Sequence, residues 1–192
     1  MLRNWQQQLE NDDMAWFAAC ADQVYEDIEL SLKHDQRNQQ RRALQFLVDL
    51  KDYIASYQSS EKWQKLLYEA LDVAHQIKAW EIGLGIWDII ESIMLQQAQQ
   101  PIEALDIIQE TLQHGCYPDL VRATYKALID LIKDPTREWD MYSLEYAVQL
   151  ASQLNKLTGV NPTNYAELNL AAAVRCTYLL QTQQANKFSS TA

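Results

Sequence analysis

The sequence predicts an all-α protein in which antiparallel helix pairs stack as a short α-solenoid or pack as an irregular bundle of about eight helices. Only 4 Gly and 4 Pro occur in 192 residues, so the chain lacks the frequent tight turns of an all-β sandwich or barrel. Apolar residues instead recur at helical spacing along most of the sequence. With 48% hydrophobic residues and a mass of 22.3 kDa, the chain can form one domain with its own core, expected over 1–186 with a frayed tail at 187–192.

Four helices are expected in the first half of the chain, at about 12–33, 36–57, 60–77 and 81–98. Asn11 is the expected N-cap of the first helix, and Ser59 or Ser60 is that of the third. The fourth helix is apolar on nearly its whole circumference, which predicts that it lies in the centre of the helix assembly. Gly83 and Gly85 mark either the start of this helix or a close contact with a neighbouring helix.

Four more helices are expected in the second half, at 101–114, from 118, from Asp134 to about 158 and from about 162. Proline is favoured at the first position of a helix and glycine just after its end, and Pro101 and Gly115 bracket the first of these helices in that way. Gly159 closes the third. The last helix carries one apolar stripe at helical spacing, formed by Leu168, Ala172, Cys176 and Leu179.

The charge and the cysteines argue against several classes of function. The net charge is −10 at pH 7 and the isoelectric point is about 4.7, whereas nucleic-acid-binding proteins usually carry a basic face. The three cysteines lie far apart without a Cys-x-x-Cys pair, so neither a zinc site nor a redox motif is indicated. The scattered cysteines favour a reducing, cytoplasmic compartment, and we expect no cofactor. We expect no membrane span, because Asp88 and Glu91 interrupt the most apolar stretch, 82–95.

Two short patterns recur along the chain and support an arrangement of helix pairs. Glu69-Ala70-Leu71-Asp72 returns 34 residues later as Glu103-Ala104-Leu105-Asp106, a spacing typical of helix-turn-helix repeats. A glycine followed three residues later by a proline occurs at Gly115 and again at Gly159, 44 residues apart. Since glycine ends helices and proline starts them, each of these pairs predicts the corner of an α-hairpin.

The run from Glu103 to Ile129 has the order of a helix, a corner and a following helix. Its matching positions are Glu103-Ala104-Leu105, Gly115, Pro118-Asp119, Thr124-Tyr125 and Leu128-Ile129, with one residue inserted before Thr124. This run resembles one unit of a pentatricopeptide or tetratricopeptide repeat. The resemblance covers about one repeat of the chain and implies a tetratricopeptide-like stack of α-hairpins. Base-reading residues are not carried over, because a single unit of an acidic chain does not suit RNA.

Histidines and carboxylates lie one helical turn apart at two places. Asp72 and His75 are three residues apart, with Glu69 one turn earlier, and Glu110 and His114 are four apart. Such pairs occur in helical di-iron sites, so the alternative function is a helical-bundle enzyme or cofactor-binding protein of the haem-oxygenase-like or di-iron type. A second Glu-x-x-His copy is missing, which favours ordinary surface or capping histidines.

Two groups of side chains are candidates for binding a partner. Arg37, Arg41 and Arg42 fall on one face of the second helix, where they either clamp a partner's carboxylates or pair with acidic helices of the same chain. Large aromatic residues are common in interface hot spots, although they also fill gaps between helices. The aromatic candidates are Trp5, Trp16, Tyr25 and Trp80.

The sequence as a whole favours a non-catalytic protein-interaction module, acting as an adaptor, a chaperone or a regulatory subunit. Stacked helix pairs leave a groove that suits a partner's peptide or helix. Residues 66–120 carry 9 acidic side chains and 1 basic one, which suits a partner with a basic surface. Homo-oligomers are compatible with this interpretation.

Overall fold

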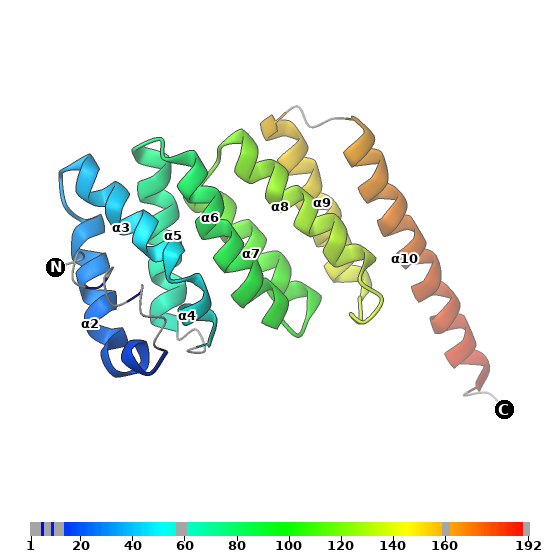
Figure 1. Cartoon of the computed structure of the whole chain (residues 1–192). Helices are drawn as coiled ribbons and strands as arrows, with labels where there is room; N and C mark the ends of the chain where they lie inside the picture. Colours follow the sequence, from blue (N-terminus) through cyan, green and yellow to red (C-terminus); the bar gives the residue numbers. More distant parts are fainter. Residues whose placement is uncertain (1–4, 6–8, 10–13, 57–60, 159–161, 190–192) are drawn as a thin grey trace. The chain divides into compact units, whose positions relative to one another are not determined.

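The computed structural model describes residues 5, 9, 14–56, 61–158 and 162–189, and the elements that it contains are helices (Figure 1). The prediction of an all-α fold is therefore confirmed. The α-helices are α2 (Met14–Leu32), α3 (Arg37–Asp49), α4 (Lys51–Ser56), α5 (Glu61–Gln76), α6 (Trp80–Ile90), α7 (Pro101–His114), α8 (Pro118–Lys133), α9 (Met141–Thr158) and α10 (Pro162–Ser189), and a π-helix, η1 (Glu91–Leu95), follows α6. Asn11, Ser59, Ser60, Gly159 and residues 190–192 lie outside the described residues.

The chain forms two compact units, of which the first comprises Met1–Gln97 with Glu110–Leu120 and the second comprises Ala98–Gln109 with Val121–Ala192. In the first unit, α2 packs against α3 and α5 packs against α6. These two antiparallel pairs stack on each other, with α2 on α5 and α3 on α6 (Figure 1). This is the hairpin-on-hairpin arrangement that the sequence predicts.

Aromatic rings fill the core between α2, α4 and α5. The ring of Phe17 lies 5.6 Å from that of Tyr53 and 5.8 Å from that of Trp63. The prediction of one helix over 36–57 is wrong at Leu50, which separates α3 from α4 and has φ −84° and ψ 4°. The local sequence does not predict this break, because neither glycine nor proline occurs near Leu50. The turn at Leu50 leaves Tyr53 in contact with Phe17, so tertiary packing accounts for it.

The apolar segment that the sequence places in the centre is α6 with η1. Ile86, Trp87 and Ile90 are almost fully buried, as expected. Gly83 and Gly85 lie within α6 and serve close contacts: a Cβ atom at Gly83 would overlap the hydroxyl of Tyr117, and one at Gly85 would lie 2.9 Å from a Val48 methyl group. Of the two interpretations left open for these glycines, the close contact with a neighbour is the correct one.

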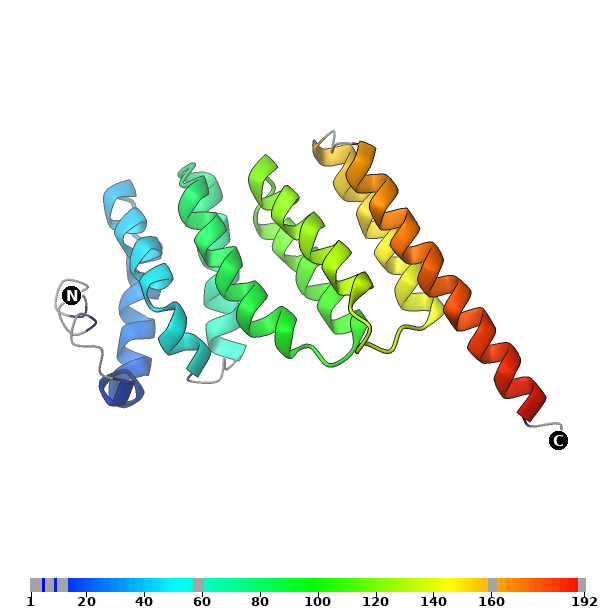
Figure 2. The same cartoon turned by 45° about the vertical axis from the view of Figure 1, so that its right-hand side comes forward.

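In the second unit, α9 packs against α10 (Figure 2), and a hydrogen bond joins each of them to a helix of the preceding pair. The hydroxyl of Tyr146 in α9 lies 3.2 Å from a carboxylate oxygen of Asp106 in α7. Arg175 in α10 donates a hydrogen bond of 2.9 Å to the carbonyl oxygen of Ile132 in α8. Both units thus have the same arrangement, in which corresponding helices of successive pairs lie against each other.

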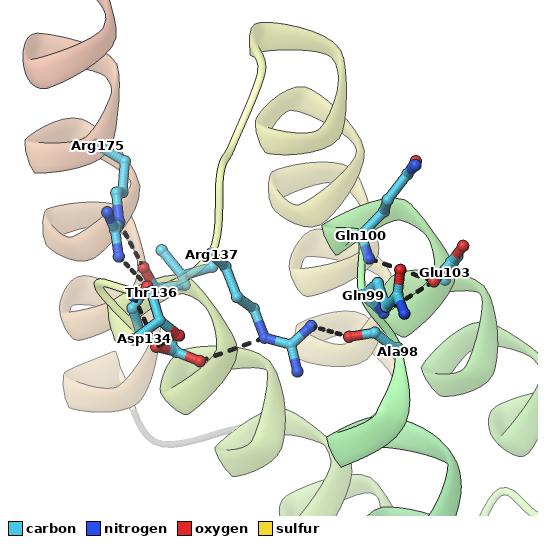
Figure 3. Close-up of polar contacts among 9 residues, drawn as sticks. Ala98, Gln99, Gln100, Glu103, Asp134, Thr136, Arg137 and Arg175 are labelled. Carbon is cyan, nitrogen blue, oxygen red and sulfur yellow. Dashed lines mark hydrogen bonds and ion pairs between the residues drawn. The ribbon is translucent and has the colours of Figure 1, made fainter.

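The helix expected from Asp134 begins instead at Met141, so this predicted boundary is wrong. The backbone N–H of Ser143 donates to a carboxylate oxygen of Asp140 at 2.7 Å, which makes Asp140 the N-cap of α9. The Asp134 carboxylate accepts hydrogen bonds from Thr136 and lies 3.3 Å from the Arg137 guanidinium (Figure 3). The Asp134-Pro135 pair therefore forms a turn that precedes the helix.

None of the described helices combines the length and the apolar character that crossing a bilayer demands.

Candidate protein-binding surface

The last helix, α10, carries two apolar faces on opposite sides. Leu168 and Ala172 are buried on one face, as the sequence predicts, whereas Cys176 and Leu179 of the same predicted stripe are only half-buried. On the opposite face, Leu170, Val174 and Tyr178 are 67%, 61% and 61% exposed. Positions two residues apart differ by about 200° around an α-helix, so these two stripes point in opposite directions. We call Leu170, Val174 and Tyr178 the outer stripe of α10.

A groove of about 490 Å³ runs between α8 and the outer stripe. Its wall is mainly apolar and consists of Ile132, Pro135, Leu170, Ala171, Val174 and Tyr178. Lys133 and Glu167 also line the groove and form an ion pair with each other, so neither charge is left alone there. Arg175 completes the lining and directs its guanidinium to backbone carbonyls, so each charged group of the groove already has a partner beside an otherwise apolar surface.

Arg175 fixes the position of α10 against α8. Its guanidinium donates hydrogen bonds to the carbonyl oxygens of Ile132 and Asp134, at the C-terminal end of α8 (Figure 3). The last carbonyl groups of a helix have no partner within the helix, and a cationic donor satisfies them well. In the same region, Arg137 donates to the carbonyl oxygen of Ala98 at 2.6 Å, which ties the loop before α9 to the start of α7. These hydrogen bonds attach α10 to α8 and the loop before α9 to the segment before α7, beside the groove.

The outer stripe is almost free of charge. Between Leu168 and Asn186, Arg175 is the single ionisable Lys, Arg, Asp or Glu residue in the sequence, and its guanidinium is directed to backbone carbonyls. The inner stripe of this helix was predicted from the sequence, and the outer one was not. The signal was present, because Leu170, Val174 and Tyr178 recur every four residues on the same helix.

The predicted arginine cluster lies on the surface of the first unit. Arg37, Arg41 and Arg42 are all exposed at the N-terminal end of α3. None of the three pairs with an acidic side chain among the residues that the structure describes. The intramolecular pairing that the sequence left open finds no support there, and binding of a partner's carboxylates stays a prediction.

The four predicted aromatic residues differ in their surroundings. Tyr25 is only 7% exposed and packs edge-on against Trp63, with the ring centres 5.6 Å apart. Trp5 and Trp16 are half-buried and lie 5.6 Å apart, and the Trp5 indole N–H donates to Asp27 at 2.7 Å. Trp80, at 44%, is the most exposed of the four. Core packing therefore accounts for Tyr25, whereas Trp80 stacks on Tyr117 at 6.2 Å and leaves a large part of its surface exposed.

One histidine–carboxylate contact forms between helices. His114 Nδ1 lies 2.8 Å from Asp72 Oδ2, and its ring stacks on Tyr68 at 5.2 Å. The remaining predicted ligands lie elsewhere, since His75 stacks on Tyr117 and Glu69 lies 3.9 Å from Lys65. Glu110 is exposed. Burial of the Tyr68 ring raises the pKa of Tyr68, and the negative charge of Glu110 raises it further. Across the described part of the chain, no three His, Cys, Asp or Glu side chains come together as metal ligands would.

In comparisons with known proteins, no family, curated protein or solved structure matched this chain. The likeness of residues 103–129 to a tetratricopeptide or pentatricopeptide unit is therefore a resemblance of sequence order, and the helix–corner–helix that it implies is present as α7 and α8.

Proposed function

We propose that the chain is a non-catalytic protein-interaction module, of the adaptor, chaperone or regulatory-subunit kind, and that it binds a partner helix in the groove between α8 and α10. The observation that carries this proposal is the outer stripe of α10. Exposed large apolar residues are unremarkable singly, but a contiguous row beside an apolar groove is typical of a binding surface. A helix with two opposite apolar faces is one that packs on both sides.

The spacing of the outer stripe suits a helical partner. Side chains at i, i+4 and i+8 form a row that an apolar face of another helix can meet over two turns. Fully burying one Leu or Val side chain contributes about 1.5–3 kcal/mol to the free energy of association. Tyr is enriched among the interface residues that carry most of the binding energy. Because the groove charges are already paired, we expect the contacting face of the partner to be apolar and uncharged.

The test uses substitution of Leu170 by Glu, with Leu30→Glu as the matched control, because Leu30 is 64% exposed on α2 of the other unit. A partner is first isolated with the unmodified chain and purified, and its Kd is then measured for the three proteins. We expect L170E to weaken binding at least about 10-fold, which corresponds to about 1.4 kcal/mol, and L30E to leave it unchanged. Equal affinity for L170E and the unmodified chain would remove the groove from the proposal.

The arginine cluster of α3 is a second candidate contact for such a partner. Three exposed guanidinium groups without described acidic neighbours are available for bidentate contacts with carboxylates. Replacing Arg37, Arg41 and Arg42 together by Glu is expected to lower the affinity for an acidic partner and to reduce the salt dependence of binding. Unchanged affinity at low salt would exclude this cluster as a contact.

The alternative of a di-iron or haem-type enzyme rests on a single contact. Asp72 and His114 meet, but Glu69 lies beside Lys65 and His75 stacks on Tyr117. The stacking of His114 on Tyr68 and its contact with Asp72 are those of a packing contact between α5 and the end of α7. We therefore base the proposal on the outer stripe.

A further inference from the structure

We infer that the partner helix is α10 of a second copy of this chain, packed antiparallel on the outer stripe around a two-fold axis at Val174. This inference rests on the proposed function, because it names the occupant of the same groove. It follows from the order of residues along the stripe, from the size of the side chains beside it and from the distribution of charge along the chain.

The outer stripe is self-complementary when a two-fold axis passes through its centre. Val174 lies four residues from both Leu170 and Tyr178, so an antiparallel copy brings Leu170 of one chain against Tyr178 of the other. Val174 then faces its own copy at the axis. Contacts of this kind, in which the same patch serves both chains, are the rule in two-fold dimers.

The residues beside the outer stripe allow two helices to approach closely. Ala173 and Thr177 are small and exposed on one side of the stripe, and Ala171 lines the groove on the other. Small residues beside large ones provide the holes into which the large side chains of a facing helix fit. Between Leu168 and Asn186 the helix has no Lys, Asp or Glu, and its one Arg, Arg175, directs its guanidinium to backbone carbonyls of α8, so few charged groups have to be removed from water at the contact.

The charge distribution favours the segment that contains α10, over the rest of the chain, as the place where two copies meet. Residues 121–192 contain 7 basic and 6 acidic side chains, whereas residues 1–120 contain 9 basic and 20 acidic ones. Two copies therefore repel each other through the first 120 residues and are electrostatically neutral toward each other through the segment that contains α10. A contact between copies is thus expected on the outer stripe.

The first experiment measures mass in solution by sedimentation or light scattering over a dilution series. We expect the unmodified chain to have twice its 22.3 kDa mass at high concentration. Leu170→Glu and Val174→Glu are each expected to give the monomer, since each places two carboxylates in the contact, whereas Leu30→Glu is expected to remain a dimer. Circular dichroism of each variant checks that the helices are retained.

The second experiment tests the register without disrupting the contact. Val174→Cys is expected to form a disulfide between copies on mild oxidation, because residue 174 faces itself at the axis. Leu170→Cys is not expected to do so, because the two copies of residue 170 are then separated by about 12 Å along the helices. Trypsin cleaves after Arg175 and so separates position 174 from Cys176, which lets mass spectrometry assign the linked residue.

Three results would overturn the inference. They are a monomer at every concentration, a dimer that L170E and V174E leave intact, and cross-linking of L170C in preference to V174C. If the chain is monomeric but L170E still weakens the binding of another protein, the second copy is excluded and the proposed function stands. If neither dimerisation nor partner binding responds to L170E, both fail.

Discussion

At the scale of single residues, the contact between Tyr117 and Gly83 shows how little space separates α6 from the segment after α7. The Tyr117 ring lies nearly parallel to those of His75 and Trp80, with centres 6.3 Å and 6.2 Å away. Its hydroxyl is buried over Gly83 and has no hydrogen-bond partner among the described residues. Burial of this ring raises the pKa of Tyr117 above its usual value. The hydroxyl is thus present at an energetic cost.

We predict that Gly83→Ala destabilises the protein by about 1–3 kcal/mol, because the added methyl group overlaps the Tyr117 hydroxyl and the stacked ring resists movement. This loss exceeds the gain of up to about 1 kcal/mol that alanine brings within a helix. Tyr117→Phe removes an unpaired buried hydroxyl and is expected to be neutral or stabilising. Urea unfolding of both variants measures these changes.

The double variant supplies the control. If the hydroxyl is the obstacle, Gly83→Ala in the Tyr117→Phe background costs much less than alone, and the two substitutions are coupled by at least about 1 kcal/mol. Additive effects would show that another neighbour limits the space at Gly83.

At the scale of helices, the N-cap of α9 links the sequence to stability and to pH. Hydrogen bonds from the Ser143 hydroxyl and backbone N–H lower the pKa of Asp140. A lowered pKa in the folded state means that the carboxylate stabilises the fold above its unfolded pKa. That contribution is lost as the pH falls through the folded value.

We therefore predict that Asp140→Ala lowers the free energy of unfolding by about 1 kcal/mol at pH 7 and that the difference shrinks in acid. Asp140→Asn is the control, because asparagine caps a helix about as well as aspartate but does not titrate. Thermal unfolding of the three proteins from neutral pH to below pH 4 measures both effects. A constant difference between D140A and the unmodified chain across this range would contradict the assignment of the cap.

Most helices could be predicted from the sequence because each has a regular apolar period and short links. The two errors have physical causes. Asp134-Pro135 has the composition of a helix start, but Asp134 bonds to Thr136 in a turn and Asp140 provides the cap. The break at Leu50 carries no local signal, because it depends on the rings that Tyr53 meets.

The candidate site could be predicted only in part. The exposure of the arginine cluster follows from its place at the polar start of a helix. The outer stripe was not predicted, although its four-residue period is present in the sequence. The contact of Asp72 with His114 joins residues 42 positions apart. It therefore depends on which helices stack on each other, and a single sequence does not reveal this.

At the scale of the whole molecule, the distribution of charge decides how self-association depends on salt. The chain carries a net charge of −10, of which residues 1–120 contribute −11 and residues 121–192, which contain the outer stripe, contribute +1. An uncharged contact between two such chains gains nothing from electrostatic attraction, and it is opposed by repulsion between the acidic parts. Salt screens this repulsion over a Debye length of about 10 Å at 0.1 M and about 3 Å at 1 M.

We therefore predict that the dimer dissociation constant stays constant or falls as NaCl is raised from about 0.05 M to about 0.5 M, since screening weakens the repulsion and leaves the apolar contact intact. Sedimentation equilibrium at several salt concentrations measures this directly. A contact made by the arginine cluster with the acidic segment 66–120 of another copy would behave in the opposite way and weaken with salt. The sign of the salt dependence thus separates an apolar contact on α10 from an ionic one on α3. R37E/R41E/R42E adds negative charge, so it should weaken the apolar contact at low salt and leave it unchanged at about 0.5 M NaCl, where the added repulsion is screened.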